Sequence, residues 1–492
     1  MSATHTLPSR RDLYYGGAWH APVGGRRDET FDPGTGASLG AVAIAGDADV
    51  DAAVAAAKRG FDAWRAVAPL ERARILRAMA ARVREHADEL AWIDATNGGN
   101  PVHEMASDAR IAAAQLEFFA GLVTEMKGAS IPMGPDAVNF SVREPVGVVA
   151  RIIPFNHPFM FAAGKSAAPL AAGNSVIVKP PDQAPLSTLR LAELVADLLP
   201  PGTFNVLPGD RATGAALASH PGVAMVAIIG SVAAGRAVMR AASETLKPLM
   251  LELGGKNALI AYGDADPDAV AGAIVGGMNF TWCGQSCGST SRAFVHASIH
   301  DAVVERVKAR IAHFRPGLPA DPATTMGAIV SRPQLERVES YVASALSEGA
   351  RLVCGGRRPD DPKLARGHFY EATVFADVKP SMRIAQEEIF GPVLAILRWD
   401  DEKRMLDDVD AVPYGLTCSI WTNDLTTAHR AAMKVGAGYV WINEVGKHFL
   451  GAPFGGVKQS GLGREECLDE LLRFTQEKNI HIGLGKAPRP LP

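Results

Sequence analysis

The feature that most constrains the fold is a regular alternation of strand-like and helix-like segments between residues 148 and 229. Strands that alternate with helices on this spacing form a parallel sheet wound in βαβ units. The predicted strands are Val148 to Pro154, Ser175 to Val178, Phe204 to Leu207 and Ala224 to Ile229; the predicted helices are His157 to Ala171, Leu186 to Leu199 and Ala212 to Ser219. The fold class is therefore α/β, an architecture that frequently binds nucleotides.

The rest of the chain must fold around this region. A chain of 492 residues is too long for one ordinary core, so two or three structural units are expected. The segment before the alternation is predicted to be mainly helical, because apolar residues between Val50 and Trp64 and between Leu76 and Val83 recur at helical spacing. A second α/β unit is expected from about Leu253 to roughly Phe454. Its strand-like pieces are Arg292 to His296, Val393 to Leu397 and Tyr439 to Asn443.

Two segments fit neither unit. Residues Ala129 to Arg143 have no helical period and are predicted to form a hairpin that leaves the domain. The tail Phe474 to Ile482 has strand character, and it could pair with such an arm in another subunit.

Composition argues against several classes of partner. Lys plus Arg total 50 against 53 for Asp plus Glu, a net charge of −3, so there is no electrostatic reason to expect nucleic acid or an anionic membrane. No apolar run approaches the roughly 18–20 residues of a membrane span. The N-terminus carries charges and a proline where a signal peptide needs an apolar core. The expected location is the cytoplasm.

The cysteines point to a single reactive thiol. The chain has five cysteines, an odd and sparse set that argues against a disulfide framework: Cys283, Cys287, Cys354, Cys418 and Cys467. No second Cys or His pair lies near Cys283 and Cys287 at zinc spacing, so no metal is expected. Cys287 lies in GQSCGSTSR, where small residues let a backbone amide approach the thiol. It is a candidate nucleophile. A buried core thiol is the alternative for both cysteines.

Glu252 and Asn156 are the other candidate catalytic residues. Glu252 lies in LELGGKN, at an expected strand end. A partly desolvated glutamate has a raised pKa and can remove a proton from water, whereas an acid that merely faces solvent is the alternative. Asn156 lies in PFNHP, at the start of a predicted helix. Its amide could donate to a developing oxyanion, or it could simply cap the helix.

Polar residues after the next strands suggest a nucleotide site. Lys179 and Asp182 lie in VKPPD. Lys179 could reach a ribose hydroxyl or a phosphate, or be a solvated charge, and Asp182 could accept hydrogen bonds from a ribose. Gly230 and Ser231 lead into a helix whose N-terminus could hold a pyrophosphate. The segment is not GxGxxG, and as a fingerprint it is weak by itself.

Taken together and in this order, these segments resemble the aldehyde dehydrogenase superfamily, NAD(P)-dependent and of the hydrolytic type. The matching stretches, from about residue 30 to residue 480, are PFNHPFMFAAGKSAAPLAAGNSVIVKP, LELGGKN, GQSC, EEIFGPV, WIN and PFGGVKQSGLGRE. The resemblance implies a Rossmann-like NAD-binding domain (1–126 and 146–252) and a catalytic domain (253–454). It also implies a bridging arm (127–145 and 470–492) that builds homodimers or homotetramers.

The resemblance also implies roles for individual residues. Cys287 becomes the nucleophile, Glu252 the general base and Asn156 the oxyanion donor for oxidation of an aldehyde to the acid through a thiohemiacetal and a thioester. The implied NAD contacts are Pro154, Lys179, Asp182, Gly230, Ser231, Leu253, Glu388 and Phe390. A CoA-acylating enzyme and a non-catalytic scaffold are the alternatives. Glu252 speaks against the first, and the intact catalytic residues speak against the second.

The chain departs from the family pattern in the cofactor loop. Ile228 and Ile229 stand where Phe-Thr is usual, Ala233 where Glu is frequent, and Asp182 where Glu is more usual. NAD is still expected over NADP, because the Asp182 carboxylate would repel a 2′-phosphate.

The helix after Asn156 is predicted to line the aldehyde tunnel. Its face carries His157, Met160 and Gly164 at helical spacing. Gly164 indicates either needed space, and thus a bulky or aromatic substrate, or close helix packing. Ser286, His448 and Phe454 complete the expected pocket, in which His157, Lys447 and His448 could favour an anionic group.

Overall fold

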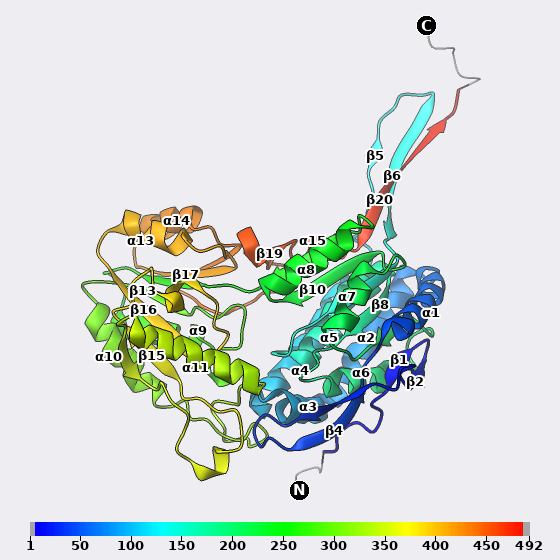
Figure 1. The fold of residues 1–492 in the computed structure, drawn as a ribbon. Coiled ribbons are helices and arrows are strands. Elements are labelled where there is room, and N and C mark those ends of the chain that lie inside the picture. The colour runs from blue at the N-terminus through cyan, green and yellow to red at the C-terminus, as the bar shows by residue number, and fades with distance from the viewer. Residues whose placement is uncertain (1–4, 486–492) are drawn as a thin grey trace.

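The computed structural model describes residues 5–485, which form two α/β units side by side and a narrow arm that projects from one of them (Figure 1). The predicted α/β class is confirmed. Within the described range no helix combines the length and apolar character of a membrane span.

The first unit is built on an eight-stranded sheet of order β19-β11-β10-β7-β8-β9-β1-β2. Strands β11, β10, β7, β8 and β9 run parallel, as the alternation predicts. The eight strands are β1 (Leu13–Tyr15), β2 (Ala18–His20), β7 (Val148–Ile152), β8 (Ser175–Lys179), β9 (Phe204–Val206), β10 (Met225–Gly230), β11 (Leu249–Leu253) and β19 (Gly461–Leu462).

Helices cover both faces of this sheet. Apolar residues of α1 (Asp47–Arg65), α7 (Arg211–Ser219) and α8 (Val232–Ser243) form a core on one face. The core of the other face includes α2 (Pro69–Glu85), α3 (Ala87–Gly98), α4 (Val102–Gly121), α5 (Pro158–Ala172) and α6 (Leu186–Val195). Because parallel strands end at one edge, the residues that follow β7, β8, β10 and β11 gather there.

Three details differ from the sequence-based expectations. The first segment is mainly helical, as predicted, but the residues before α1 also form four strands that were not predicted: β1, β2, β3 (Arg27–Phe31) and β4 (Ser38–Ala43). Strands as short as β1 and β2 show no alternation of apolar and polar residues that could be recognised in the sequence. The position of β1 is set by its pairing with β9. Helix α6 ends at Val195 instead of Leu199, ahead of a Pro-Pro pair that cannot continue it. Strand β18 (Tyr439–Ile442) ends before Asn443, whose φ of 53° is left-handed.

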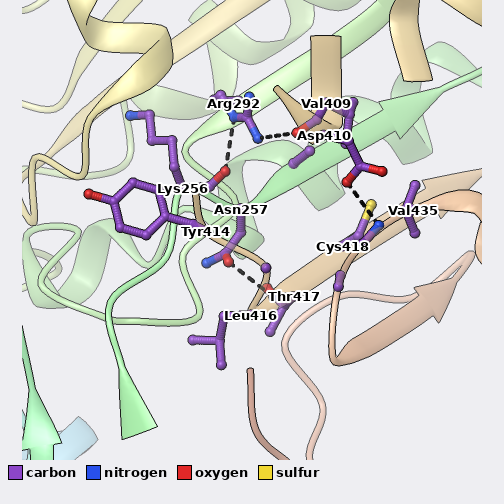
Figure 2. A pocket seen from close by; sticks show the side chains of 14 residues that line it. Lys256, Asn257, Arg292, Val409, Asp410, Tyr414, Leu416, Thr417, Cys418 and Val435 are labelled. Carbon is purple, nitrogen blue, oxygen red and sulfur yellow. Dashed lines mark hydrogen bonds between the residues drawn. The ribbon is translucent and has the colours of Figure 1, made fainter. Parts of the chain in front are cut away.

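The second unit is joined to the first by residues 254–257, between β11 and β12. Its seven-stranded sheet has the order β14-β15-β16-β13-β12-β17-β18, parallel apart from β14. The strands are β12 (Ala258–Ala261), β13 (Arg292–His296), β14 (Arg351–Cys354), β15 (Thr373–Ala376), β16 (Val393–Trp399), β17 (Thr417–Trp421) and β18 (Tyr439–Ile442). Asn257 and Arg292 lie at the start of this sheet and bind its neighbouring loops (Figure 2).

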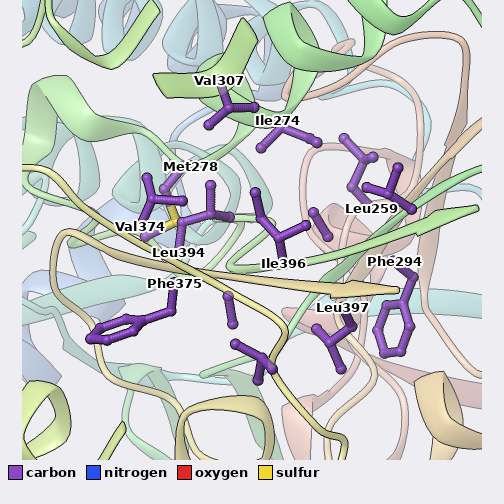
Figure 3. Packing of buried hydrophobic residues seen from close by; sticks show 14 of the residues in the cluster. Leu259, Ile274, Met278, Phe294, Val307, Val374, Phe375, Leu394, Ile396 and Leu397 are labelled. Atoms are coloured by element: carbon purple, nitrogen blue, oxygen red, sulfur yellow. The ribbon is translucent and has the colours of Figure 1, made fainter. Parts of the chain in front are cut away.

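One large apolar core holds most of the second unit together. Leu259, Phe294, Leu394 and Ile396 of the central strands pack with Ile274 of α9 (Figure 3). The helices of this part are α9 (Pro267–Gly277), α10 (His300–Ile311), α11 (Arg332–Ser347), α12 (Arg383–Gln386), α13 (Glu402–Asp410) and α14 (Leu425–Lys434). The chain then returns to the first unit, where β19 pairs with β11 and α15 (Leu468–Arg473) contacts α5.

The arm is a three-stranded antiparallel sheet of order β20-β6-β5. It contains β5 (Ser130–Ile131), β6 (Ala137–Pro145) and β20 (Thr475–Gly483). The tail therefore pairs with the arm of its own chain, where the sequence suggested an arm of another subunit, and the register runs from Thr475 opposite Pro145 to Gly483 opposite Ala137. The long edge of β20 opposite β6 has no partner within the described residues.

Candidate active site

Two cavities meet at Cys287 and Glu252. One, of about 360 Å³, lies between α4, α5 and the loops around Trp282 and His448. The other, of about 420 Å³, lies at the carboxyl ends of β7 and β10 and reaches Phe390. Cys287, Glu252 and Ile229 line both. Cavities of this size hold small molecules, so the thiol can be approached by two ligands from two sides.

The loop that carries Cys287 is fixed by Asn257. Its side-chain nitrogen donates to the carbonyl oxygens of Cys287 at 2.6 Å and Ser289 at 3.0 Å. Its side-chain oxygen accepts from the backbone N–H of Thr417 at 3.0 Å (Figure 2). Asn257 lies in the segment that follows Glu252, so one short stretch of chain positions both candidate catalytic residues.

Burial controls the charge of the two candidate catalytic groups. Glu252 is 4% exposed, and neither carboxylate oxygen has a hydrogen-bond partner in the part of the chain that the structure describes. Burial, followed by the nearby Glu465, raises the pKa of Glu252 to about 8. Burial, followed by Glu252, raises the pKa of the Cys287 thiol well above its usual value. The thiol therefore needs an adjacent base, and Glu252 stands beside it.

Asn156 is buried and lines the 420 Å³ cavity. The N-cap of α5 is His157, so the alternative role of Asn156 as the helix cap is wrong. Its carbonyl accepts from the Asn100 side chain at 2.7 Å, which holds the backbone in place. The side-chain oxygen has no partner among residues 5–485. The amide group is therefore positioned and available.

Most predicted cofactor residues line the same 420 Å³ cavity. They are Pro154, Gly230, Ser231, Glu388 and Phe390. Ser231 caps α8 by accepting from the backbone N–H of Ala234 at 3.2 Å. Glu388 accepts from the Gly255 N–H at 3.0 Å, and burial raises its pKa to about 7.

Three predicted cofactor residues lie outside that cavity. Leu253 is buried against Gly235, where an added Cβ would come within 2.6 Å of the leucine. Lys179 is buried at the end of β8, and its carbonyl accepts from the Ile153 N–H at 3.2 Å. Asp182 follows at the surface. Lys179 and Asp182 thus lie at the same edge of the sheet as the end of β7, beyond the neighbouring strand β8.

Five of the six predicted pocket residues line the 360 Å³ cavity: His157, Met160, Ser286, His448 and Phe454. The prediction that Gly164 lines the tunnel is wrong. Gly164 faces Gln115 of α4, and an added Cβ would lie 1.8 Å from the Gln115 oxygen. Close packing of α4 on α5 is the reason for this glycine. Lys447 lines neither cavity and pairs with Glu444.

A buried network of charges in the 360 Å³ cavity was not assigned from the sequence. Glu465 accepts from Arg151 at 2.6 Å and pairs with Lys165 at 2.9 Å, and Glu466 pairs with His448 at 3.1 Å. Lys165 and Glu465 lie within the matched stretches PFNHPFMFAAGKS and GLGRE, and a lysine inside an otherwise apolar helix was the available signal. Asp108, which also lines the cavity, had no such signal.

The fold and this site define a class: a two-sheet α/β protein with a half-buried thiol and a buried carboxylate between two cavities. The chain belongs to the aldehyde dehydrogenase family, whose sequence profile, described as "Aldehyde dehydrogenase family", matches residues 19–480. It is 51% identical over 489 residues to aldehyde dehydrogenase tropH of Talaromyces stipitatus, covering 98% of this chain and 95% of that protein.

Solved structures agree over nearly the whole chain. PnpE from Pseudomonas sp. WBC-3 is 38% identical with a TM-score of 0.95, covering 98% of this chain and 99% of that one. PnpE has also been solved in complex with nicotinamide adenine dinucleotide. Gamma-glutamyl-gamma-aminobutyraldehyde dehydrogenase from Burkholderia cenocepacia is 40% identical with a TM-score of 0.94, covering 97% of this chain and 98% of that one.

Proposed function

We propose that the protein oxidises an aldehyde to the carboxylic acid with NAD⁺, and that Cys287 carries the acyl group as a thioester. The observation that carries the proposal is that Cys287 and Glu252 line both cavities. One cavity can then hold the aldehyde and the other the cofactor, with the thiol between them.

The steps follow from the chemistry of the residues. Glu252 takes the thiol proton, and the Cys287 sulfur attacks the aldehyde carbon. The Asn156 amide and the Cys287 backbone N–H stabilise the oxyanion of the resulting thiohemiacetal. Loss of a hydride from the thiohemiacetal gives the thioester, and Glu252 releases the thiol proton to solvent and is ionised again. Glu252 then removes a proton from water, which attacks the thioester, so that the Cys287 thiolate leaves and the acid is released.

The 420 Å³ cavity fits a nicotinamide dinucleotide. Gly254 packs against Glu388, and a Cβ at this position would lie 1.9 Å from the Glu388 carboxylate. The glycine therefore leaves room for the Glu388 side chain in the cavity wall. Gly230 and Ser231 would hold the pyrophosphate, Glu388 and Phe390 the nicotinamide ribose and ring, and Lys179 and Asp182 the adenosine ribose. When bound, the dinucleotide supplies the hydride acceptor for the oxidation. NAD is proposed over NADP on the charge of Asp182.

The aldehyde is proposed to be bulky or aromatic. The 360 Å³ cavity is walled by Phe161, Trp282, Trp441 and Phe454, which suit a flat apolar ring. A homodimer or homotetramer is proposed because the long edge of β20 exposes backbone groups that need partners. A mass near that of one subunit by light scattering at micromolar concentration would contradict the oligomer.

A broad aldehyde panel tests the proposal. The purified protein is mixed with NAD⁺ and each aldehyde, and the reduced nicotinamide absorbance is followed without CoA. Steady, acid-producing turnover is expected for at least one aldehyde. Absence of turnover without CoA, with turnover in its presence, would contradict the hydrolytic route.

A further inference from the structure

The 360 Å³ cavity contains a buried histidine held by a carboxylate. Asp108 on α4 and His157 at the start of α5 join through Oδ2 and Nδ1 at 2.7 Å, and their side chains are 3% and 8% exposed. Burial lowers the pKa of His157, but Asp108, with weaker contributions from Asp94 and Glu104, outweighs it, so the net shift is upward. Asp108 therefore fixes the ring with Nδ1 protonated and Nε2 as the remaining polar atom.

The Nε2 atom of His157 is available for a ligand. It makes no hydrogen bond to any residue between 5 and 485, although the residue lines the cavity. The ring stands edge-on to Trp282 at 4.7 Å and to Phe161 at 5.4 Å. His157 Nε2 is thus a polar atom without a partner beside two aromatic side chains. Gln115 Oε1 and Trp282 Nε1, which belong to the same lining, also have no partner among residues 5–485. A purely apolar ligand would leave His157 Nε2 without a partner, which costs binding energy.

The charges in the cavity favour a neutral partner for this atom. His157 is already paired with Asp108, and Lys165 is paired with Glu465 and Glu466. His448 also faces Glu466. A carboxylate on the substrate would meet no unpaired cation here and several buried acids. A hydroxyl group, in contrast, both donates and accepts, so it can bind Nε2 in either protonation state of the ring.

We propose that His157, positioned by Asp108, selects aromatic aldehydes that carry a ring hydroxyl, which binds Nε2 while the aldehyde faces Cys287. The inference rests on the proposed function and adds the substrate class. His157 touches the substrate; Asp108 is a positioning residue that acts through it.

The test compares kcat/KM for benzaldehyde, the three hydroxybenzaldehydes, the three methylbenzaldehydes as controls of size, and 4-carboxybenzaldehyde. At least one hydroxy isomer is expected to exceed both benzaldehyde and its methyl counterpart by about 10- to 100-fold, the value of a hydrogen bond to a charged or strongly polarised group. In His157→Phe that ratio should fall to about 1. His157→Gln keeps a polar group, so its ratio of kcat/KM for the hydroxy isomer to that for the methyl isomer should lie between those of His157→Phe and the wild type.

Controls separate specificity from folding. His103→Phe makes the same chemical change on the exposed side of α4 and should keep the wild-type ratio. If His157→Phe is unfolded because Asp108 is left as an unpaired buried charge, His157→Phe with Asp108→Asn removes that charge and should still give a ratio of about 1. Asp108→Asn alone should lower the ratio and alter its dependence on pH.

The outcomes are distinct. A wild-type ratio of about 1, a preference for 4-carboxybenzaldehyde, or an unchanged ratio in a folded His157→Phe protein would overturn the role of His157 and leave the proposed function intact. Failure of every aldehyde to reduce NAD⁺ would overturn the proposed function itself.

Discussion

Cys287 and Glu252 come from different α/β units and line the same two cavities. Glu252 lies on β11 of the first sheet, and Cys287 lies in the loop that leads into β13 of the second. Asn257, at the junction of the sheets, donates to the Cys287 carbonyl and so holds the loop beside the carboxylate. The site therefore depends on the relative placement of the two sheets.

Cys287→Ala is expected to abolish steady aldehyde-dependent reduction of NAD⁺, because the acyl group then has no sulfur to bind. Cys283→Ala is the matched control. Cys283 is fully buried and donates to the Gly327 carbonyl at 3.1 Å, so its loss should affect stability more than kcat. Activity near wild type in Cys287→Ala, with loss in Cys283→Ala, would reassign the nucleophile.

The pH dependence of deacylation should report Glu252. Only the ionised carboxylate accepts a proton from water, and burial raises the pKa of this group to about 8. The single-turnover deacylation rate is therefore expected to rise as pH increases through about 8 and to level off above it. A glutamate with its ordinary pKa would give a flat profile from pH 6 to 10, which would contradict the assigned base.

Asp182→Ser is expected to narrow the preference for NAD over NADP. The substitution removes an exposed carboxylate that would repel a 2′-phosphate, so kcat/KM for NADP should rise relative to that for NAD. Folding should be unaffected, since the side chain is at the surface. The measurement is the ratio of kcat/KM for NAD to kcat/KM for NADP. An unchanged ratio would mean that a residue other than Asp182 discriminates between the two cofactors.

Periodicity predicted α1, α2 and the alternating strands and helices from β7 to β10, because each of these is buried and regular. It could not predict β1 and β2, which are three residues long; β1 is placed by pairing with β9, and β2 by pairing with β1. The catalytic candidates were found because Cys287, Glu252 and Asn156 lie in distinctive short motifs. Asp108 was missed, because a single acid within a helix looks like an ordinary surface charge until α5 brings His157 to it.

Gly164 shows that a glycine in a helix does not by itself indicate an open cavity, because close helix packing also requires one. Gly164→Ala is expected to destabilise the protein by about 1–3 kcal/mol, because a Cβ there would lie 1.8 Å from the Gln115 oxygen and overpack α4 against α5. Gly121→Ala, on the same helix as Gln115 and with nothing within 4 Å of an added Cβ, is the control and should not destabilise. Equal thermal midpoints for the two variants would contradict the packing explanation.

The central claim is that the acyl group is carried by Cys287 and released by Glu252, and trapping the acyl-enzyme tests it most directly. Glu252→Gln is mixed with NAD⁺ and an aldehyde that the wild type oxidises, quenched in acid, and analysed by intact mass and peptide mapping. Because Glu252 also takes the thiol proton, acylation is slowed in this variant, but hydrolysis of the thioester is blocked. A slow burst of reduced cofactor of up to one equivalent per subunit is therefore expected, with an acyl mass on the peptide that contains Cys287. No such mass should form in the variant that also carries Cys287→Ala. Full steady turnover without any adduct, or an adduct on Cys283, would contradict the account.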